Sequence, residues 1–107
     1  MNWLDVISQC FDSDKILYSY HARKEMFEEE FGIITDGEVY EAVSRGEVIE
    51  TYSDDMPYPS VLVFGTTNVK RPLHVVCAYN AEDTQLIIIT VYQPSPDKWD
   101  NYRRRKK

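Results

Sequence analysis

Leu73-His-Val-Val-Cys-Ala-Tyr79 and Leu86-Ile-Ile-Ile-Thr-Val-Tyr92 are the two stretches that decide the fold. Both are apolar at nearly every position and rich in β-branched and aromatic residues, which is typical of strands with both faces covered. Glu47–Tyr52 and Ser60–Thr66 are two more β-rich runs, and turn-forming residues separate all four. We therefore predict an antiparallel meander of four strands with the last two in the centre.

The chain before Gly46 follows a helical period instead. Apolar residues recur every three or four positions from Trp3 to Phe11, which predicts an amphipathic helix. After a brief extended piece at 16–18, Ser19 is placed to cap a second helix that runs to about Phe31, where Gly32 would end it.

A third helix has the clearest signals. Thr35 and Glu38 have the spacing of a capping box, and Gly46 fits the position just past the helix end. Helices followed by strands predict an α+β fold, with three N-terminal helices packed on a four-stranded antiparallel sheet. The length of 107 residues and the 43% hydrophobic content fit a single domain, which we place at residues 1–102, followed by a basic tail at 103–107.

Charge is unevenly distributed along this acidic chain, whose net charge is −6. The last five residues hold five of the 12 Lys and Arg residues, which leaves seven against 18 Asp and Glu residues over 1–102, a net charge of −11. Through Arg103 and Arg104 the tail could contact phosphates or an acidic protein, or it could be a solvated chain end.

Some features argue for a cytoplasmic protein without a cofactor. The N-terminus lacks the basic and apolar regions of a leader, and no apolar run is long enough to span a bilayer. Cys10 and Cys77 lie in apolar patterns without metal-ligand spacing, so we expect reduced packing residues, no disulfide and no metal site.

Several segments, in order, resemble the DUF4258 family over about residues 16–92. The matching segments are His21–Met26, Glu38–Glu50, Pro57–Ser60, Arg71–Val76 and Ile89–Tyr92. The resemblance implies a relative of the RelE and BrnT toxins, which are compact α+β ribonucleases paired with an antitoxin, in some cases a zinc-finger protein of the YgiT type. It implies the toxin of a type II toxin–antitoxin pair, with RNA as substrate.

The two histidines are the first candidates for catalysis without a metal. Imidazole titrates near neutrality, and RNA cleavage needs a base for the 2′-hydroxyl and an acid for the leaving 5′ oxygen. His21 lies at a predicted helix start, where backbone N–H groups favour an anion, but it could equally donate to a backbone carbonyl. His74 shares a strand face with Val76 and Ala78, so it could be a core histidine or a catalyst.

Tyr92 completes the predicted catalytic set, because its hydroxyl at a strand end could orient a phosphate. We place Thr90 and Tyr92 on the same sheet face as Leu86 and Ile88. A packed aromatic ring with a hydrated hydroxyl is the alternative for Tyr92.

Cations and one further aromatic residue are the predicted substrate contacts. Arg71 could fork two phosphoryl oxygens from its loop, Arg23 and Lys24 could add positive charge, and Tyr58 could stack on a base. Solvation or packing explains each of them without RNA. Because Glu25 stands where the family commonly has Arg and the body is acidic, a non-catalytic protein-binding or regulatory module of the same fold is the alternative.

Overall fold

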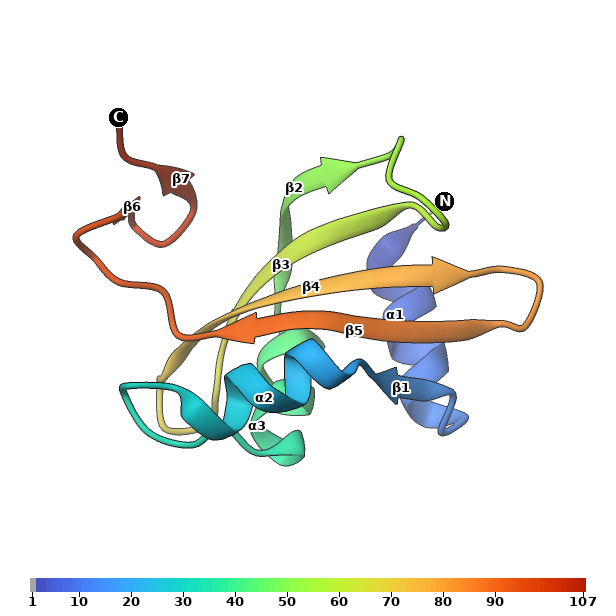
Figure 1. Cartoon of the computed structure of the whole chain (residues 1–107), viewed down its shortest axis with the longest axis horizontal. Coiled ribbons are helices and arrows are strands. Elements are labelled where there is room, and N and C mark those ends of the chain that lie inside the picture. Colours follow the sequence, from blue (N-terminus) through green and yellow to red (C-terminus); the bar gives the residue numbers. More distant parts are fainter. Residues whose placement is uncertain (1) are drawn as a thin grey trace.

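The computed structural model describes residues 2–107, which form three helices, a five-stranded sheet and a small C-terminal hairpin (Figure 1). The helices are α1 (Trp3–Asp12), α2 (Tyr20–Glu28) and α3 (Asp36–Ser44). The strands are β1 (Ile16–Tyr18), β2 (Glu47–Tyr52), β3 (Ser60–Thr66), β4 (Pro72–Asn80), β5 (Gln85–Tyr92), β6 (Trp99–Asp100) and β7 (Arg104–Arg105).

The α+β class and the three helices are as predicted, but the four-stranded antiparallel sheet is wrong. The main sheet is mixed, with the order β1-β5-β4-β3-β2, and β1 runs parallel to β5. Its three residues are too few to show a strand period in the sequence, and their partners are Leu86, Ile87 and Ile88, about 70 positions away. The second sheet, β6–β7, was also not predicted.

The helix signals gave the correct starts and one wrong end. Ser19 caps α2, and Thr35 with Glu38 forms the capping box of α3. However, α2 ends at Glu28 and not near Phe31, because Glu29 has extended backbone angles. Gly32, with a φ of 113°, lies in the loop that follows.

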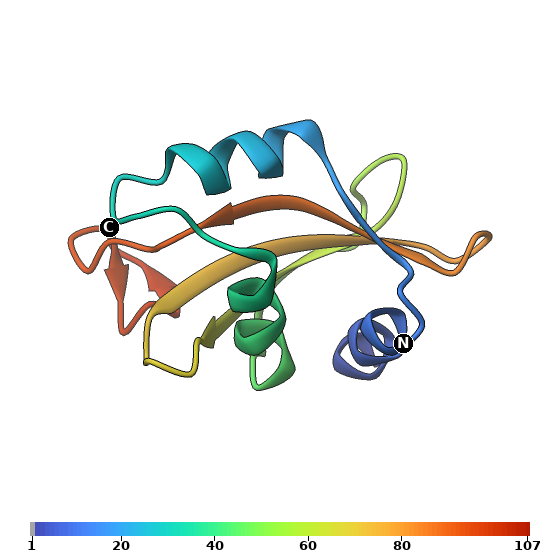
Figure 2. The ribbon, with the colours of Figure 1, turned by 90° about the horizontal axis from the view of Figure 1, so that it is seen from below.

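One core lies between the helices and the sheet. Figure 2 shows α1 and α3 together on one side of the sheet and α2 beside β5. The core includes Ile7, Met26, Val39, Val75 and Ile88, together with both cysteines, which are free and buried as packing residues.

A β-bulge changes the faces of β5. The register between β4 and β5 shifts between Val76 and Cys77. As a result Leu86 and Ile88 face the helices, whereas Tyr92 pairs with His74 on the opposite face, and the prediction that they share a face with Tyr92 is wrong.

The C-terminal hairpin, β6–β7, packs on this opposite face. Its turn residues Asn101 and Tyr102 have φ values of 52° and 61°, and Arg103 N–H donates to the carbonyl of Asp100 at 3.0 Å. The Trp99 ring packs against His74, so the hairpin covers the start of β4.

Candidate functional site

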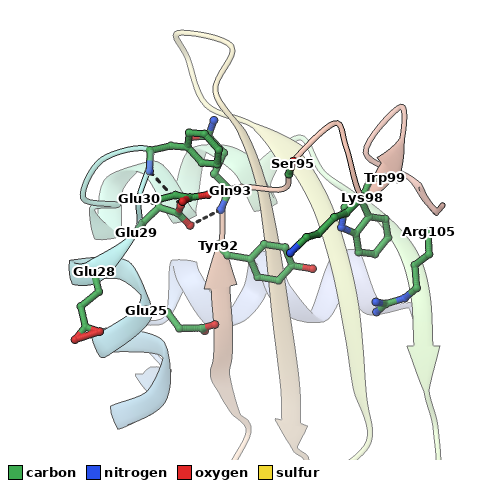
Figure 3. Close-up of a pocket in the computed structure, with 11 residues that line it drawn as sticks. Glu25, Glu28, Glu29, Glu30, Tyr92, Gln93, Ser95, Lys98, Trp99 and Arg105 are labelled. Atoms are coloured by element: carbon green, nitrogen blue, oxygen red, sulfur yellow. Dashed lines mark hydrogen bonds between the residues drawn. The ribbon is translucent and has the colours of Figure 1, made fainter. Parts of the chain in front are cut away.

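An open cleft of about 530 Å³ lies where α2, the end of β5 and the C-terminal hairpin meet (Figure 3). One wall, called the α2 wall here, is formed by α2 and the residues just after it and carries four glutamates; the hairpin wall carries Lys98, Trp99 and Arg105. Tyr92 lies between the two walls. The remaining lining residues are Phe31, Gln93 and Ser95.

The α2 wall takes the place of a missing strand. Because β1 ends at Tyr18, the end of β5 has no strand neighbour on that side. Glu25 Oε1 accepts from Val91 N–H at 3.1 Å, and Glu29 Oε1 accepts from Gln93 N–H at 2.8 Å. The carboxylates of Glu25 and Glu29 therefore satisfy alternate N–H groups along the edge of β5 and the residue that follows it.

The four glutamates of this wall are not equivalent. Burial raises the pKa of Glu25, while the hydrogen bond from Val91 and the charge of His21 oppose the rise. Glu28 and Glu30 are exposed, and neither forms an ion pair within residues 2–107. Their carboxylates are free to meet a ligand at the mouth of the cleft.

Cations dominate the hairpin wall. The Arg105 guanidinium binds Glu50 through Nε at 3.0 Å and Nη2 at 3.1 Å, and it lies 4.7 Å from the centre of the Trp99 ring. This pairing lowers the pKa of Glu50. Lys98 extends from the hairpin toward Tyr92 (Figure 3) and has no acidic partner in the described part of the chain.

Tyr92 and His74 form a hydrogen-bonded pair between the cleft and the protein interior. The Tyr92 hydroxyl lies 2.9 Å from His74 Nδ1, and His74 Nε2 lies 2.6 Å from the Tyr102 carbonyl oxygen. Burial lowers the pKa of His74 and raises that of Tyr92 to about 12, so the ring is neutral and the phenol protonated at neutral pH. Since a carbonyl only accepts, Nε2 carries the proton, and the Tyr92 hydroxyl donates to Nδ1.

The structure does not bring the two histidines to one substrate. His74 is 0% exposed, with the Trp99 ring 4.4 Å away and edge-on, so it reaches the cleft only through Tyr92. The His21 side chain is 64% exposed in the first turn of α2, and its Nε2 lies 3.3 Å from Glu25 Oε1. It does not line the cleft.

Arg71, just before the start of β4, links several parts of the fold. Its side chain is 15% exposed, and each of its three nitrogen atoms donates within the protein. Nη1 lies 3.1 Å from both Glu38 Oε2 and the Ile33 carbonyl, Nε donates to Gln93 at 2.7 Å, and Nη2 donates to the Gly32 carbonyl. These bonds fix the loop between α2 and α3.

The remaining α2 candidates lie outside the cleft. Arg23 forms a two-pronged ion pair with Asp36 and stacks 3.9 Å from the centre of the Tyr18 ring, so it links α2 to α3. Lys24 is exposed on α2 and does not line the cleft.

Two strand and loop candidates are also separate from the cleft lining. Thr90 is half-buried on the same sheet face as Tyr92. Tyr58 accepts a hydrogen bond from Asn80 Nδ2 at 3.0 Å. Asn80 ends β4 and His74 lies near its start, so Tyr58 is at the opposite end of the strand from the cleft.

The hairpin gives the two predicted RNA contacts of the basic tail, Arg103 and Arg104, different orientations. Arg103 pairs with Glu47 and lies 4.9 Å from the centre of the Phe64 ring. Arg104 is exposed and lies opposite Asp100 in the hairpin register. The two predicted tail contacts therefore have different surroundings.

Sequence reasoning missed Glu25, Lys98, Trp99 and Arg105 as members of one site. A Trp with a neighbouring Lys shortly after the last strand was the available signal for the hairpin wall. The sequence could not show the role of Glu25, because its bond to Val91 depends on where β1 ends.

The fold and the cleft define a small α+β domain with an open, charged cleft at one end of its sheet. The family model for a domain of unknown function, DUF4258, matches residues 18–93, which is well over half of the chain. The chain belongs to this family, and the hairpin wall lies beyond the matched range. Neither the curated proteins nor the solved structures contain a match. None of the helices within residues 2–107 has the length and apolar character needed to cross a bilayer.

Proposed function

We propose that the protein is a metal-independent endoribonuclease that acts in the cleft and serves as the toxin of a type II toxin–antitoxin pair. The observation that carries the proposal is the Tyr92 hydroxyl, which is held by His74 and faces the same cleft as Lys98 and Arg105. The resemblance to RelE and BrnT toxins supplies the substrate class, RNA.

Tyr92 is the proposed general acid. Its pKa of about 12 keeps the phenol protonated at neutral pH, while a leaving alkoxide is a stronger base than the phenolate. His74 acts through Tyr92 as a positioning residue, because its Nδ1 holds the phenol oxygen at the cleft in the resting state. When the bond between phosphorus and the 5′ oxygen breaks, the Tyr92 O–H turns from His74 Nδ1 to that oxygen and gives it the proton.

Glu25 is the proposed general base. Burial raises the pKa of this carboxylate and thereby makes it a stronger base than a solvated one. It takes the proton of the 2′-hydroxyl, and the 2′ oxygen then attacks phosphorus. The products are a 2′,3′-cyclic phosphate and a 5′-hydroxyl end.

The hairpin wall supplies the positive charge that this reaction needs. Negative charge builds on the phosphoryl oxygens as the new bond forms, and nearby cations stabilise it. Lys98, which has no acidic partner among residues 2–107, is the principal cation, and Arg105 shares its charge with Glu50.

The test is cleavage of a mixed-sequence RNA in the presence of EDTA. We expect the wild-type protein to produce cyclic phosphate ends, and Tyr92→Phe to be slower by roughly 100-fold or more, as for loss of a general acid. Tyr20→Phe is the matched control, because Tyr20 is 83% exposed and away from the cleft.

Lys98→Gln gives a second variant, since Lys98 is exposed and its loss should leave the fold intact. We expect it to cleave roughly tenfold more slowly or worse, from the lost phosphate charge. Absence of wild-type cleavage, or wild-type rates in both Tyr92→Phe and Lys98→Gln, would overturn the proposal.

A non-catalytic protein-binding module is the second candidate. The free carboxylates of Glu28 and Glu30 at the mouth of the cleft favour a basic segment of a partner protein, such as a zinc-finger antitoxin. Harmless overexpression together with tight binding of such a partner would support this function, and growth arrest would count against it.

A further inference from the structure

The C-terminal hairpin presents two different basic faces. Successive side chains of a strand point to opposite sides, and Arg103 and Arg105 both reach acidic residues of β2, namely Glu47 and Glu50. In the hairpin register Arg105 lies opposite Trp99, which packs on the sheet, whereas Arg104 lies opposite Asp100 and therefore points away from the sheet. Arg103 and Arg105 hold the hairpin, while Arg104 faces solvent.

Free positive charge is concentrated at this end of the molecule. Ion pairs occupy four of the 12 Lys and Arg residues: Arg23, Arg71, Arg103 and Arg105. Within the described residues, eight others form none, and four of these lie between positions 98 and 107. These are Lys98, Arg104, Lys106 and Lys107.

A groove lies beside the outward basic residues. It has a volume of about 450 Å³ and is lined by Asp100, Arg104, Arg105, Lys106 and Lys107. Arg105 also lines the cleft, so the two hollows meet at this residue. The groove and the cleft that holds Tyr92 therefore lie next to each other at Arg105.

We infer that the outward face of the hairpin, formed by Arg104, Lys106 and Lys107, binds the phosphate backbone of single-stranded RNA and leads it into the cleft. This inference rests on the proposed function for its substrate. A single strand fits because one wall of the cleft is cationic and the other is acidic, so the second backbone of a duplex would meet Glu28 and Glu30.

Asp100 opposes this binding. It pairs with Arg104 in the hairpin register, so the two side chains lie on the same face. Its carboxylate lines the groove and repels phosphate. Asp100→Asn should therefore strengthen RNA binding.

The experiment measures binding of a short, fluorescent 2′-O-methyl RNA, which has no free 2′-hydroxyl and cannot be cleaved by the proposed mechanism. Anisotropy is recorded for the full-length protein over a series of salt concentrations. The test variant replaces Arg104, Lys106 and Lys107 with Gln, and the matched control replaces Lys15, Lys24 and Lys70, three exposed cations elsewhere on the protein.

We expect the test variant to bind at least about tenfold more weakly at low salt. Its plot of log affinity against log salt should be shallower by about 2, since each phosphate contact on a single strand contributes about 0.7. The control should stay within about threefold of the wild type at about 0.1 M salt, where charges more than about 10 Å from the RNA are screened.

Equal losses in the test and control variants would show that net charge alone matters and would overturn the inference, as would undetectable wild-type binding. The probe is not cut, so binding and cleavage are tested separately. If the protein binds RNA through the hairpin but has no nuclease activity, this inference holds and the proposed function fails. If the protein cleaves RNA but the test variant binds the probe as well as the wild type, the proposed function holds and this inference fails.

Discussion

The two walls of the cleft carry opposite charges but are built in the same way. In the α2 wall, Glu25 of the helix and Glu29 just after it accept hydrogen bonds from Val91 and Gln93, while Glu28 and Glu30 remain free. On the hairpin, Arg103 and Arg105 pair with β2, while the residue between them, Arg104, remains free. In each wall some charges hold the element to the sheet and others face solvent.

This comparison shows why a run of like charges is not one surface. The end of α2 at Glu29 separates the side chain of this residue from its neighbours in the run Glu28–Glu30, and strand alternation separates Arg104 from Arg105. The structural and the free members of each run can therefore be distinguished by substitution.

The largest expected effect comes from breaking the hairpin wall at its anchor. Trp99 is 6% exposed and packs against His74, so Trp99→Ala should lower the free energy of unfolding by about 3–5 kcal/mol. Phe27→Ala removes an aromatic ring that is 72% exposed and should change it by less than about 0.5 kcal/mol. Urea unfolding measures both, and a Trp99→Ala protein as stable as the control would refute the hairpin's part in the fold.

The α2 wall gives an intermediate effect. Glu29 accepts from the backbone N–H groups of Gln93 and Phe31, so Glu29→Ala should cost about 1.5–3 kcal/mol. Glu28→Ala, one residue away and without such bonds, should stay within about 0.5 kcal/mol. Similar values for the two variants in urea unfolding would contradict the proposed division of the wall.

A smaller, pH-dependent effect comes from the residue behind the cleft. Burial holds the pKa of His74 below its ordinary value, so the unfolded chain takes up a proton at a higher pH than the folded one. The contribution of neutral His74 to the free energy of unfolding is fully present above about pH 6.5. It falls as the pH drops below this value, by at most about 1.4 kcal/mol for each pH unit.

The matched variant for this effect is His74→Gln, which cannot titrate. Unfolding curves between pH 7.5 and roughly 5.5 should diverge, with the wild type losing stability relative to the variant. Protonation of Glu25, whose pKa is raised, acts in the opposite direction in both proteins and cancels in the comparison. Parallel curves would mean that His74 is not held neutral.

Local signals in the sequence predicted the parts of the fold that depend on neighbouring residues. The capping box of Thr35 and Glu38 and the runs that became β3, β4 and β5 are examples. The parallel strand β1 could not be predicted in this way, since three residues show no period and their partners are distant in sequence.

The candidate site was harder to predict because its geometry depends on irregularities. A bulge puts Tyr92 on the face of His74, and the free edge of β5 determines the role of Glu25. The structure brings His74 and Tyr92 into contact across β4 and β5, but the burial of His74 and its second hydrogen bond depend on Trp99 and Tyr102 of the hairpin.

The most direct test of the central claim is RNA cleavage by His21→Ala and Tyr92→Phe, measured side by side in EDTA. The account predicts that His21→Ala keeps its rate within a few-fold, since His21 lies outside the cleft lining, while Tyr92→Phe loses roughly 100-fold or more. Loss of activity in His21→Ala together with an unaffected Tyr92→Phe would contradict it.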